Sequence, residues 1–152
     1  LQEVRRRDWK VPVLLSGSSY DSNTIALGKE ATEGVFAAGF IPNPDDRSPQ
    51  EVKDWIAKYE AKFGPLKAPL YAAYSYAIVK VAVEGLKNAG PNLTVDTLVE
   101  GMEKMKGYKT IFGGPAIGFT STNHKGMQGS ALFKVEGGRW VQAVGDLPAV
   151  AQ

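Results

Sequence analysis

The stretch LLSGSSYDSN, at residues 14–23, holds the side chains of this sequence that are best suited to chemistry. Hydroxyl groups next to small residues can supply a nucleophile, surround a phosphate or bind a small solute. An aromatic ring and a carboxylate follow directly after the small residues. The candidate ligand-binding residues here are Ser16, Gly17, Ser18, Ser19 and Tyr20, with Asp21 as a further possibility.

The spacing of these serines does not favour catalysis. A hydrolase elbow has glycine two residues before and two residues after the serine, and neither residues 14–18 nor residues 17–21 meet this pattern. The only histidine, His124, lies more than one hundred residues away. An enzyme that uses Ser18 and His124 is the competing alternative, but we expect no catalytic residue in this chain.

Cofactor and metal sites are not predicted either. A Walker loop needs a lysine and a hydroxyl residue after its last glycine, and a dinucleotide fingerprint needs three spaced glycines. The stretch has Gly17 alone, the chain has no cysteine, and a lone His124 is a poor metal site. We therefore expect no cofactor and no bound metal.

The remaining interpretation is one wall of a pocket for a small solute. Residues 11–15 predict a strand that is buried on both faces of a parallel sheet, and ligands collect outside the carboxyl ends of such strands. A helix that begins at Asp21 or Ser22 would add its positive end, which favours a carboxylate or another anion. A plain turn followed by a helix cap explains the same residues equally well, so both interpretations stay open.

A second group of candidates lies farther along the chain. Tyr71, Tyr74 and Tyr76 stand at the start of an apolar segment with helical periodicity. Tyr71 and Tyr74 share a face, whereas Tyr76 projects roughly 200° from Tyr74 because each helical residue turns by 100°. One face therefore belongs to the core and another can line a cleft, where tyrosine offers a ring and a hydroxyl for recognition.

The elements around these residues predict an α/β fold. A strand over residues 11–15, a helix over residues 22–33 and a strand over residues 34–40 form a strand–helix–strand unit with parallel strands. From residue 109 onward the pattern becomes extended again, and residues 136–138 predict the turn of a hairpin.

Three consecutive helical patterns separate these two strand-bearing ends. The first, over residues 48–63, begins with a capping box at residues 48–51. The second, over residues 69–90, is apolar nearly all round, so we expect it to be the most buried helix. The third, over residues 94–106, begins at a threonine. Since one doubly wound sheet would not contain three such helices in a row, the chain predicts two bodies.

Two segments can carry the chain between these bodies. They are residues 40–44 and residues 113–115, and both are rich in proline or glycine, as hinges and linkers are. We therefore expect hinge crossings at these two places.

Composition limits the classes of partner. With 152 residues, 43% of them hydrophobic, the chain is long enough for a domain-sized core. Its formal net charge of +2 gives no electrostatic footprint for nucleic acid, which we therefore exclude as a partner. No apolar run approaches the ~20 residues that cross a bilayer. The absence of cysteine says little about the compartment.

Four segments, taken in order, carry a family resemblance. They are WKVPVLLSGSSYDSNTIALGKEATEGVF, VKDWIAKYEAKFG, YAAYSYAIVKVAVEGLKNAG and HKGMQGSALFKVEGGRWV. In this order they resemble the carboxyl-terminal part of periplasmic solute-binding proteins of the branched-chain amino acid family, which have the type I fold. The resemblance implies two lobes that close on a solute and hand it, in the periplasm, to the membrane permease of an ABC transporter. It implies no enzymatic activity.

The resemblance also implies how the chain is divided. Residues 1–40 and 116–152 would belong to the second lobe, and the helices of residues 45–112 to the first. The amino-terminal part of the parent protein has no counterpart here, so the resemblance implies a fragment. We expect such a fragment to self-associate, because the apolar surface that the absent part would cover must otherwise face water.

The family's ligand contacts map onto Gly17 and Ser18 in the loop and onto Tyr76 in the helix. Where amino-acid-binding relatives place an acidic side chain for the ligand's ammonium group, this chain has Gly17. A buried ammonium without a countercharge is costly. We therefore expect a small hydrophobic or aromatic carboxylate in an interlobe cleft, with Tyr20 and Tyr76 as ring contacts and the loop's hydroxyls and amides around the anion.

Two side chains and two functions stay open as alternatives. Asp21 could replace the missing carboxylate or act only as a helix cap, and Tyr74 could also reach the cleft. Binding of a branched-chain amino acid by the same fold is the second hypothesis for function. A ligand-sensing domain of a regulator is the third.

Overall fold

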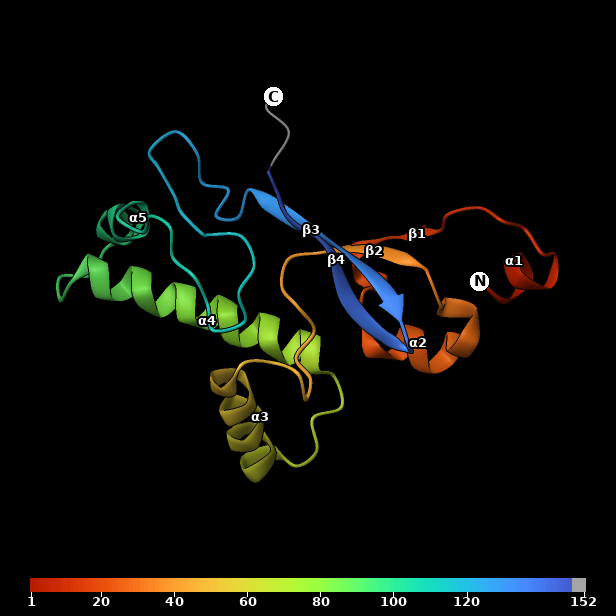
Figure 1. The fold of residues 1–152 in the computed structure, drawn as a ribbon. Helices are drawn as coiled ribbons and strands as arrows, with labels where there is room; N and C mark the ends of the chain where they lie inside the picture. The colour runs from red at the N-terminus through yellow and green to blue at the C-terminus, as the bar shows by residue number, and fades with distance from the viewer. Residues whose placement is uncertain (149–152) are drawn as a thin grey trace.

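The computed structural model of the protein describes residues 1–148, with side chains through residue 145. The helices are α1 (Gln2–Arg6), α2 (Ser22–Gly28), α3 (Gln50–Phe63), α4 (Pro69–Ala89) and α5 (Val95–Glu103). The strands are β1 (Leu14–Leu15), β2 (Phe36–Gly39), β3 (Gly129–Glu136) and β4 (Arg139–Pro148). The sheet lies with α1 and α2 at one end of the molecule, and the three longer helices extend toward the other end (Figure 1).

The sheet combines one parallel and two antiparallel pairings. Its strand order is β1-β2-β3-β4, with β1 parallel to β2 and the other neighbours antiparallel. The predicted strand–helix–strand unit, the predicted hairpin and the mixed α/β class are therefore confirmed. Gly137 and Gly138 form the hairpin turn with φ angles of 59° and 72°, which tight hairpin turns require and side chains disfavour.

The first strand is shorter and more exposed than its sequence predicts. Only Leu14 and Leu15 form β1, and Leu14 is 67% exposed. The prediction of a strand buried on both faces is therefore wrong. The reason is that β1 is the edge of this sheet, and within residues 1–148 no further strand pairs with its outer side.

The core lies between the sheet and the first turns of α3 and α4. Tyr20 and Phe133 stack with ring centroids 4.3 Å apart, and Trp140 meets Tyr20 edge-on at 5.1 Å. Val52 of α3 and Leu70 of α4 are both buried in the same cluster. The two ends of the molecule therefore share one hydrophobic core.

Helix α3 begins without the capping box that its sequence predicts. The helix starts at Gln50 with Pro49 as its N-cap residue, so Ser48 lies one position too early to cap it. The hydroxyl of Ser48 instead accepts a hydrogen bond from the backbone N–H of Asp45 at 3.0 Å. Thr94, in contrast, caps α5 as predicted.

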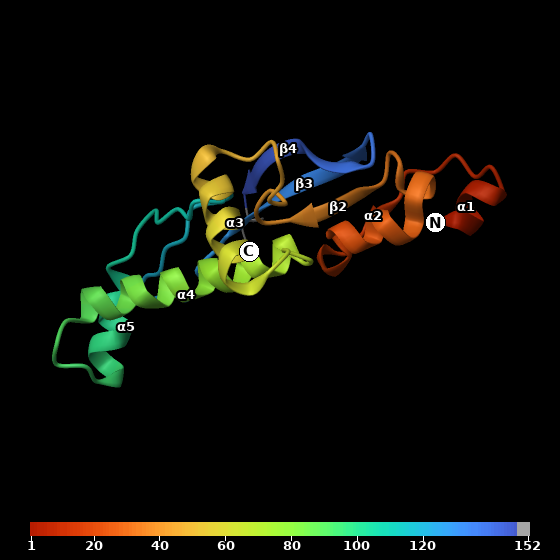
Figure 2. The ribbon, with the colours of Figure 1, turned by 90° about the horizontal axis from the view of Figure 1, so that it is seen from below.

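Helix α4 has the predicted length and is the most buried helix, although one side of it is exposed. It ends at Ala89, directly before Gly90. Ile78 and Val79 are 68% and 59% exposed, although both side chains are apolar. The prediction of the most buried helix is confirmed, because no other helix of residues 1–148 has more than one buried residue. The helix is not buried all round, since α3 and α5 cover only part of its circumference (Figure 2). Its buried residues are Leu70, Ala73 and Gly85.

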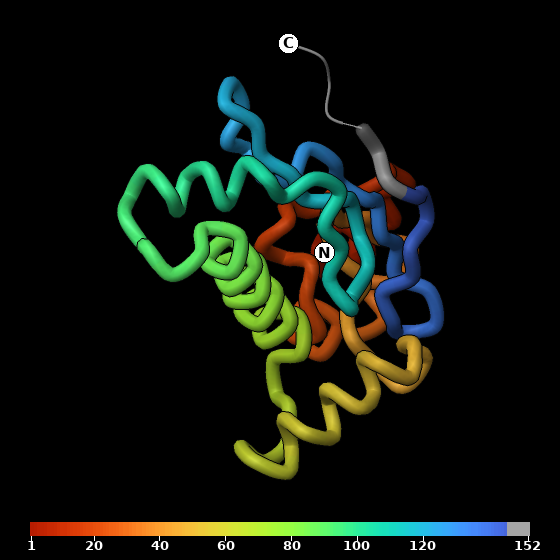
Figure 3. The backbone as a smooth tube through the Cα atoms, turned by 90° about the vertical axis from the view of Figure 1, so that its left-hand side faces the viewer, coloured from red at the N-terminus to blue at the C-terminus, as the bar shows by residue number. Residues whose placement is uncertain are grey.

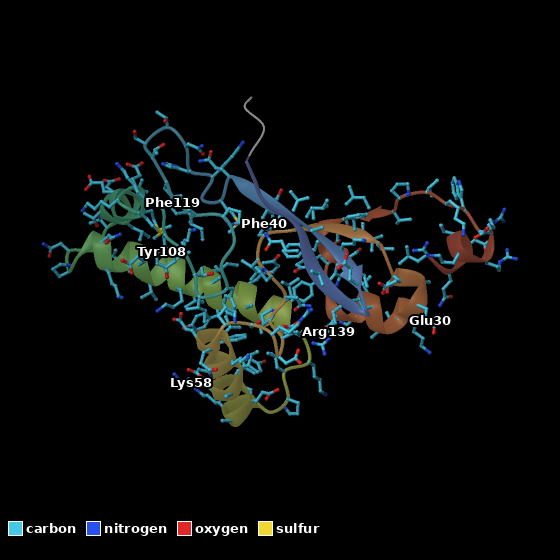
Figure 4. All side chains as sticks on the ribbon, viewed as in Figure 1. Glu30, Phe40, Lys58, Tyr108, Phe119 and Arg139 are labelled. Atoms are coloured by element: carbon cyan, nitrogen blue, oxygen red, sulfur yellow. The ribbon has the colours of Figure 1, made fainter. Side chains whose placement is uncertain are left out.

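The two predicted crossings lie against each other. A Cβ atom at Gly114 would collide with the carbonyl oxygen of Phe40, so the close approach of the two segments depends on glycine at this position. Phe40 directly follows β2, which makes this contact the point where the sheet meets the helical end. Figure 4 marks Phe40 at this junction.

The segment that follows the predicted lobe boundary at residue 116 is bonded to the helical end of the molecule. Ile117 pairs with Tyr108, and the N–H of Phe119 donates to the carbonyl of Met105 at 3.1 Å. Tyr108 and Phe119 accordingly lie at the helical end of the molecule (Figure 4). The chain rejoins the sheet only at Gly129, because these backbone bonds keep it beside α5 until then. Residues 149–152 of the predicted second lobe lie outside the described residues.

Candidate functional site

The site loop forms a single 3₁₀ turn, Gly17–Ser19, between β1 and α2. The hydroxyl oxygens of Ser16 and Ser18 lie 2.8 Å apart, and those of Ser16 and Ser19 lie 3.5 Å apart. Ser16 and Ser18 are exposed, and Ser19 is half-buried. Three hydroxyl groups therefore meet at one point that solvent can reach, and we call them the serine cluster.

The backbone of the loop adds further donors beside the serine cluster. The N–H of Ser19 is the first that bonds within the turn, to the carbonyl of Ser16 at 2.9 Å. The N–H groups of Gly17 and Ser18 precede it and have no acceptor inside the turn. A Cβ atom at Gly17 would lie 3.3 Å from the carbonyl oxygen of Ala38, so glycine lets the loop approach β2 closely. Amides and hydroxyls together can donate to a carboxylate.

Tyr20 does not lie at this site, although the sequence predicts it as a ring contact for the solute. Its side chain is fully buried against Phe133 and Trp140, and its hydroxyl accepts a hydrogen bond from the backbone N–H of Asn43 at 2.9 Å. Burial raises the pKa of the Tyr20 hydroxyl well above its usual value, and the Asn43 hydrogen bond offsets part of this rise. No face of the ring is open to a solute, because the residue that follows the 3₁₀ turn points into the core.

Asp21 is the N-cap residue of α2, which agrees with its interpretation as a helix cap. Its carboxylate accepts a hydrogen bond from the N–H of Thr24 at 2.9 Å. The backbone carbonyl of Asp21 accepts another from the indole N–H of Trp140 at 2.8 Å. The positive end of α2 therefore already faces a carboxylate, and the expectation that it serves an anionic ligand is corrected.

Tyr71 joins α4 to the site loop, a role that the sequence does not indicate. Its hydroxyl donates to the backbone carbonyl of Ser18 at 3.1 Å. Figure 3 shows the red-orange loop segment running beside the green helix α4. The aromatic run itself was a signal for this residue, but periodicity alone cannot say which helix face meets which loop.

Tyr76 points toward α3 instead of the site loop. Its ring centroid lies 5.8 Å from that of Trp55 and 5.9 Å from that of Phe112, and 36% of the side chain is exposed. Five residues of helix rotate Tyr76 by about 140° relative to Tyr71. The structure therefore brings Ser18 together with Tyr71, and it leaves Tyr76 in an aromatic cluster with part of its ring open.

Tyr74 is the remaining predicted possibility, and it packs mainly against the core. The side chain is half-buried and contacts the buried cluster. Burial raises the pKa of the Tyr74 hydroxyl, while a hydrogen bond with the backbone of Phe40 lowers it in part. Tyr74 therefore lies at the first crossing and is not part of the serine cluster.

A cavity of about 720 Å³ lies at the junction of the two ends, apart from the serine cluster. Its walls come from residues 42–52, residues 109–114 and the hairpin, and none of the predicted ligand-binding residues lines it. Arg47 lies at this cavity, where its guanidinium is already paired with Asp45 at 2.6 Å. The predicted site and this cavity are therefore different places.

The described contacts do not join Ser18 to His124. Nε2 of His124 lies 2.9 Å from Oε1 of Glu103, whereas the hydroxyl of Ser18 lies beside that of Ser16. Within the part of the chain that the structure describes, no group of three or more His, Cys, Asp or Glu side chains could hold a metal ion. Hydrogen bonding is the chemistry that the three hydroxyls of the serine cluster can supply.

The fold and the loop can now be compared with known proteins. A family model described as periplasmic binding protein matches residues 1–139. The chain belongs to this family. Periplasmic binding proteins are solute-binding proteins, in agreement with the resemblance found in the sequence. The comparison with curated proteins gives no match.

Solved structures of periplasmic binding proteins have the same fold. A branched-chain amino acid ABC transporter protein from Thermus thermophilus with bound valine has 20% identity and a TM-score of 0.78, over 97% of this chain and 42% of that one. A solute-binding protein from R. palustris in complex with benzoate has 18% identity and a TM-score of 0.69, over 99% and 40%. One from Rhodopseudomonas palustris BisB5 in complex with 3,4-dihydroxybenzoic acid has 20% identity and a TM-score of 0.70, over 99% and 41%.

This periplasmic binding protein chain spans about two fifths of the length of those structures. Its sheet, parallel at one edge and antiparallel beyond, matches part of the type I periplasmic-binding-protein fold. Among the helices of residues 1–148, none has the length and apolar character needed to cross a membrane.

Proposed function

We propose that the protein binds a small hydrophobic or aromatic carboxylate outside the cytoplasm and presents it to the permease of an ABC importer. The observation that carries this proposal is the serine cluster, held beside Tyr71 in a chain of the periplasmic binding protein family. Hydroxyls and the first amides of a turn at the end of a strand are donors that suit a carboxylate.

The charges around the loop favour a ligand without an ammonium group. By the family resemblance, Gly17 stands where amino-acid-binding relatives place an acidic side chain for an ammonium group, and the carboxylate of Asp21 is bonded to the N–H of Thr24. An ammonium without a countercharge is costly to desolvate. A carboxylate with an apolar body avoids this cost.

Two of the similar structures support the aromatic class, and one supports the alternative. The proteins from Rhodopseudomonas palustris were solved with benzoate and with 3,4-dihydroxybenzoic acid. The protein from Thermus thermophilus was solved with valine and has the highest TM-score of the three. Branched-chain amino acid binding is therefore the second candidate function.

We also propose that the solute lies between two lobes. One would contain residues 1–39 with β3 and β4, and the other would contain α3 to α5 with residues 104–128, a division that follows the backbone contacts of the loop after α5. The hinge would then run through the first crossing, residues 40–44, and through the chain before Gly129.

Titration calorimetry of the full-length protein tests the function. Benzoate and 3,4-dihydroxybenzoate should bind, and Ser18→Ala should weaken that binding by about 10- to 100-fold if it removes one hydrogen bond to a carboxylate, worth ~1.5–3 kcal/mol. Thr122→Ala, in an exposed turn, is the matched control and should leave the affinity unchanged. Tight binding of leucine or valine with no heat from the aromatic acids would establish the second candidate instead.

A further inference from the structure

We infer that the cavity at the junction of the two ends is a second binding site, which takes an organic anion with an apolar body larger than one ring. We call it the junction cavity. The inference goes beyond the proposed function, because no residue of the serine cluster lines this cavity. Its volume of about 720 Å³ lies within the range of roughly 300–1,000 Å³ that is typical of small-molecule sites. A single ring would leave most of that volume to water, so a larger body buries more apolar surface.

The walls of the junction cavity are apolar and belong largely to the hydrophobic core. The apolar side chains of the lining, prolines aside, are Val52, Ile111, Phe112, Phe133, Trp140 and Val141. Val52, Phe112 and Trp140 are each 6% exposed or less, so core packing fixes their positions. Small-molecule sites have this composition, with hydrophobic and aromatic walls and a small number of polar groups.

Polar contacts hold the separate walls of the junction cavity together. The guanidinium of Arg47 donates to Oδ2 of Asp45 at 2.6 Å and to the backbone carbonyl of Trp140 in β4 at 3.4 Å. Arg139 of the same strand pairs with the carboxylate of Asp46. The first crossing is therefore bonded to the hairpin on one side of the cavity. A site that is already formed loses less free energy to ordering when a ligand binds.

The charged residues of the lining leave one positive charge for a ligand. They are Asp45, Arg47 and Lys109. Both oxygens of the Asp45 carboxylate accept from Arg47, because Oδ1 is bonded to its backbone N–H at 2.8 Å and Oδ2 to its guanidinium. Among the side chains described through residue 145, Lys109 has no ion-pair partner. An unpaired ammonium beside apolar walls attracts an anion more strongly than one that water surrounds.

The position of Lys109 in the chain suits this role. Its side chain is exposed, so its ammonium group can approach the anionic end of a ligand from the solvent side. Ile111 and Phe112 follow it in the same segment and contribute to the apolar wall. Ser48 adds a polar group to the lining, since its hydroxyl oxygen accepts from the N–H of Asp45 and its own hydrogen remains to donate. Carboxylates and sulfonates share the acceptor oxygens and the negative charge that these groups recognise.

Titration calorimetry of the 152-residue chain with naphthalene-2-sulfonate tests the junction cavity. The wild-type chain should bind this anion, and Lys109→Glu should weaken the binding by about 3- to 10-fold, the effect of a charge at an exposed site, with an unchanged urea midpoint. Lys58→Glu makes the same change of charge at an exposed position of α3 outside the lining and should leave the affinity unchanged. Val141→Trp should abolish the binding, because a larger side chain fills the cavity from β4, where tryptophan suits a strand.

Two further measurements separate the junction cavity from the serine cluster. Ser18→Ala should bind naphthalene-2-sulfonate as the wild-type chain does, and benzoate should not displace the sulfonate. Displacement by benzoate, or loss of sulfonate binding in Ser18→Ala, would place the anion at the serine cluster and refute the second site. A wild-type chain that does not bind the sulfonate would also refute it, while the proposed function of the serine cluster would stand.

The variants distinguish the cavity from general attraction and from other surfaces. Equal weakening by Lys109→Glu and Lys58→Glu would show that the net charge of the chain attracts the anion, and it would overturn the site. Unchanged affinity of Val141→Trp would place the sulfonate on another apolar surface, with the same consequence. If the full-length protein binds no benzoate, the proposed function fails, whereas sulfonate binding that depends on Lys109 and Val141 would still establish the junction cavity as a site.

Discussion

The backbone N–H of Asn43 donates a hydrogen bond to the hydroxyl of Tyr20 at 2.9 Å. Asn43 belongs to the first crossing, and Tyr20 is the residue directly after the site loop. The ring of Tyr20 is stacked on Phe133 of β3, so the crossing, the loop and the sheet are held together at one side chain. The position of the serine cluster therefore depends on a residue that is buried in the core.

Replacement of Tyr20 by phenylalanine should destabilise the protein while preserving the ring stack. The backbone N–H of Asn43 would lose its acceptor inside the fold, which costs roughly 1–3 kcal/mol for a buried donor. The free energy of unfolding, measured by urea denaturation, should fall by that amount. Tyr59→Phe should change the free energy of unfolding by less than ~0.5 kcal/mol. An equal effect of the two substitutions would contradict a stabilising role of the Tyr20 hydroxyl as acceptor for the Asn43 N–H.

Stability should also decline in alkaline solution because of Tyr20. Burial raises the pKa of its hydroxyl above the usual tyrosine value of about 10, so the folded state keeps the proton where the unfolded chain loses it. The contribution is fully present below a pH of about 10 and is lost as the pH rises beyond it. Urea unfolding between pH values of about 8 and 11 should show a steeper loss for the wild-type protein than for Tyr20→Phe. Parallel curves would exclude Tyr20 as the cause.

Substitution of Gly39 by alanine should disturb the aromatic centre of the core. An added Cβ atom would lie 2.7 Å and 2.8 Å from two ring carbons of Tyr20 and 2.9 Å from a ring carbon of Phe133. Overpacking of this kind costs about 1–3 kcal/mol. The thermal midpoint should fall accordingly. Ala38→Ser, at the exposed neighbouring position of β2, provides the control and should be nearly neutral.

The exposed apolar strip of α4 should make the 152-residue chain self-associate. The strip consists of Ile78, Val79, Val83 and Leu86, each between 37% and 68% exposed. Burying such surface gains about 25 cal/mol per Å², so contact between copies is favoured. Light scattering after gel filtration should report a mass above that of the monomer, and Ile78→Gln should lower it. Lys80→Gln on the same helix should leave that mass unchanged. A wild-type chain that is monomeric at all concentrations would exclude the strip as a self-association surface.

Much of the fold follows from short stretches of sequence. The helix cap at Asp21, the threonine start of α5 and the glycine turn of the hairpin lie where the pattern predicts them. Each of these signals acts over a few residues, through backbone groups that a neighbouring side chain satisfies or a φ angle that glycine allows. The location of the serine cluster on a loop between a strand and a helix is predictable for the same reason.

The partners of these elements were not predictable in this way. Tyr20 was expected at a ligand and lies in the core, and α4, although the most buried helix, exposes Ile78 and Val79. Composition reports that a side chain is apolar or aromatic, but burial depends on which distant segment packs against it. Tyr71 could not be assigned for the same reason, because its partner Ser18 lies 53 residues earlier.

The sequence by itself determined the class of the fold, the order of its elements and the hydroxyl-rich loop, since periodicity, caps and turns are local consequences of residue type. Only the tertiary structure decided that Tyr71 meets this loop, that Tyr20 supports it from within, and that Tyr76 turns toward α3. These outcomes depend on contacts between segments far apart in the chain, which form only when the sheet and the helices pack around one core.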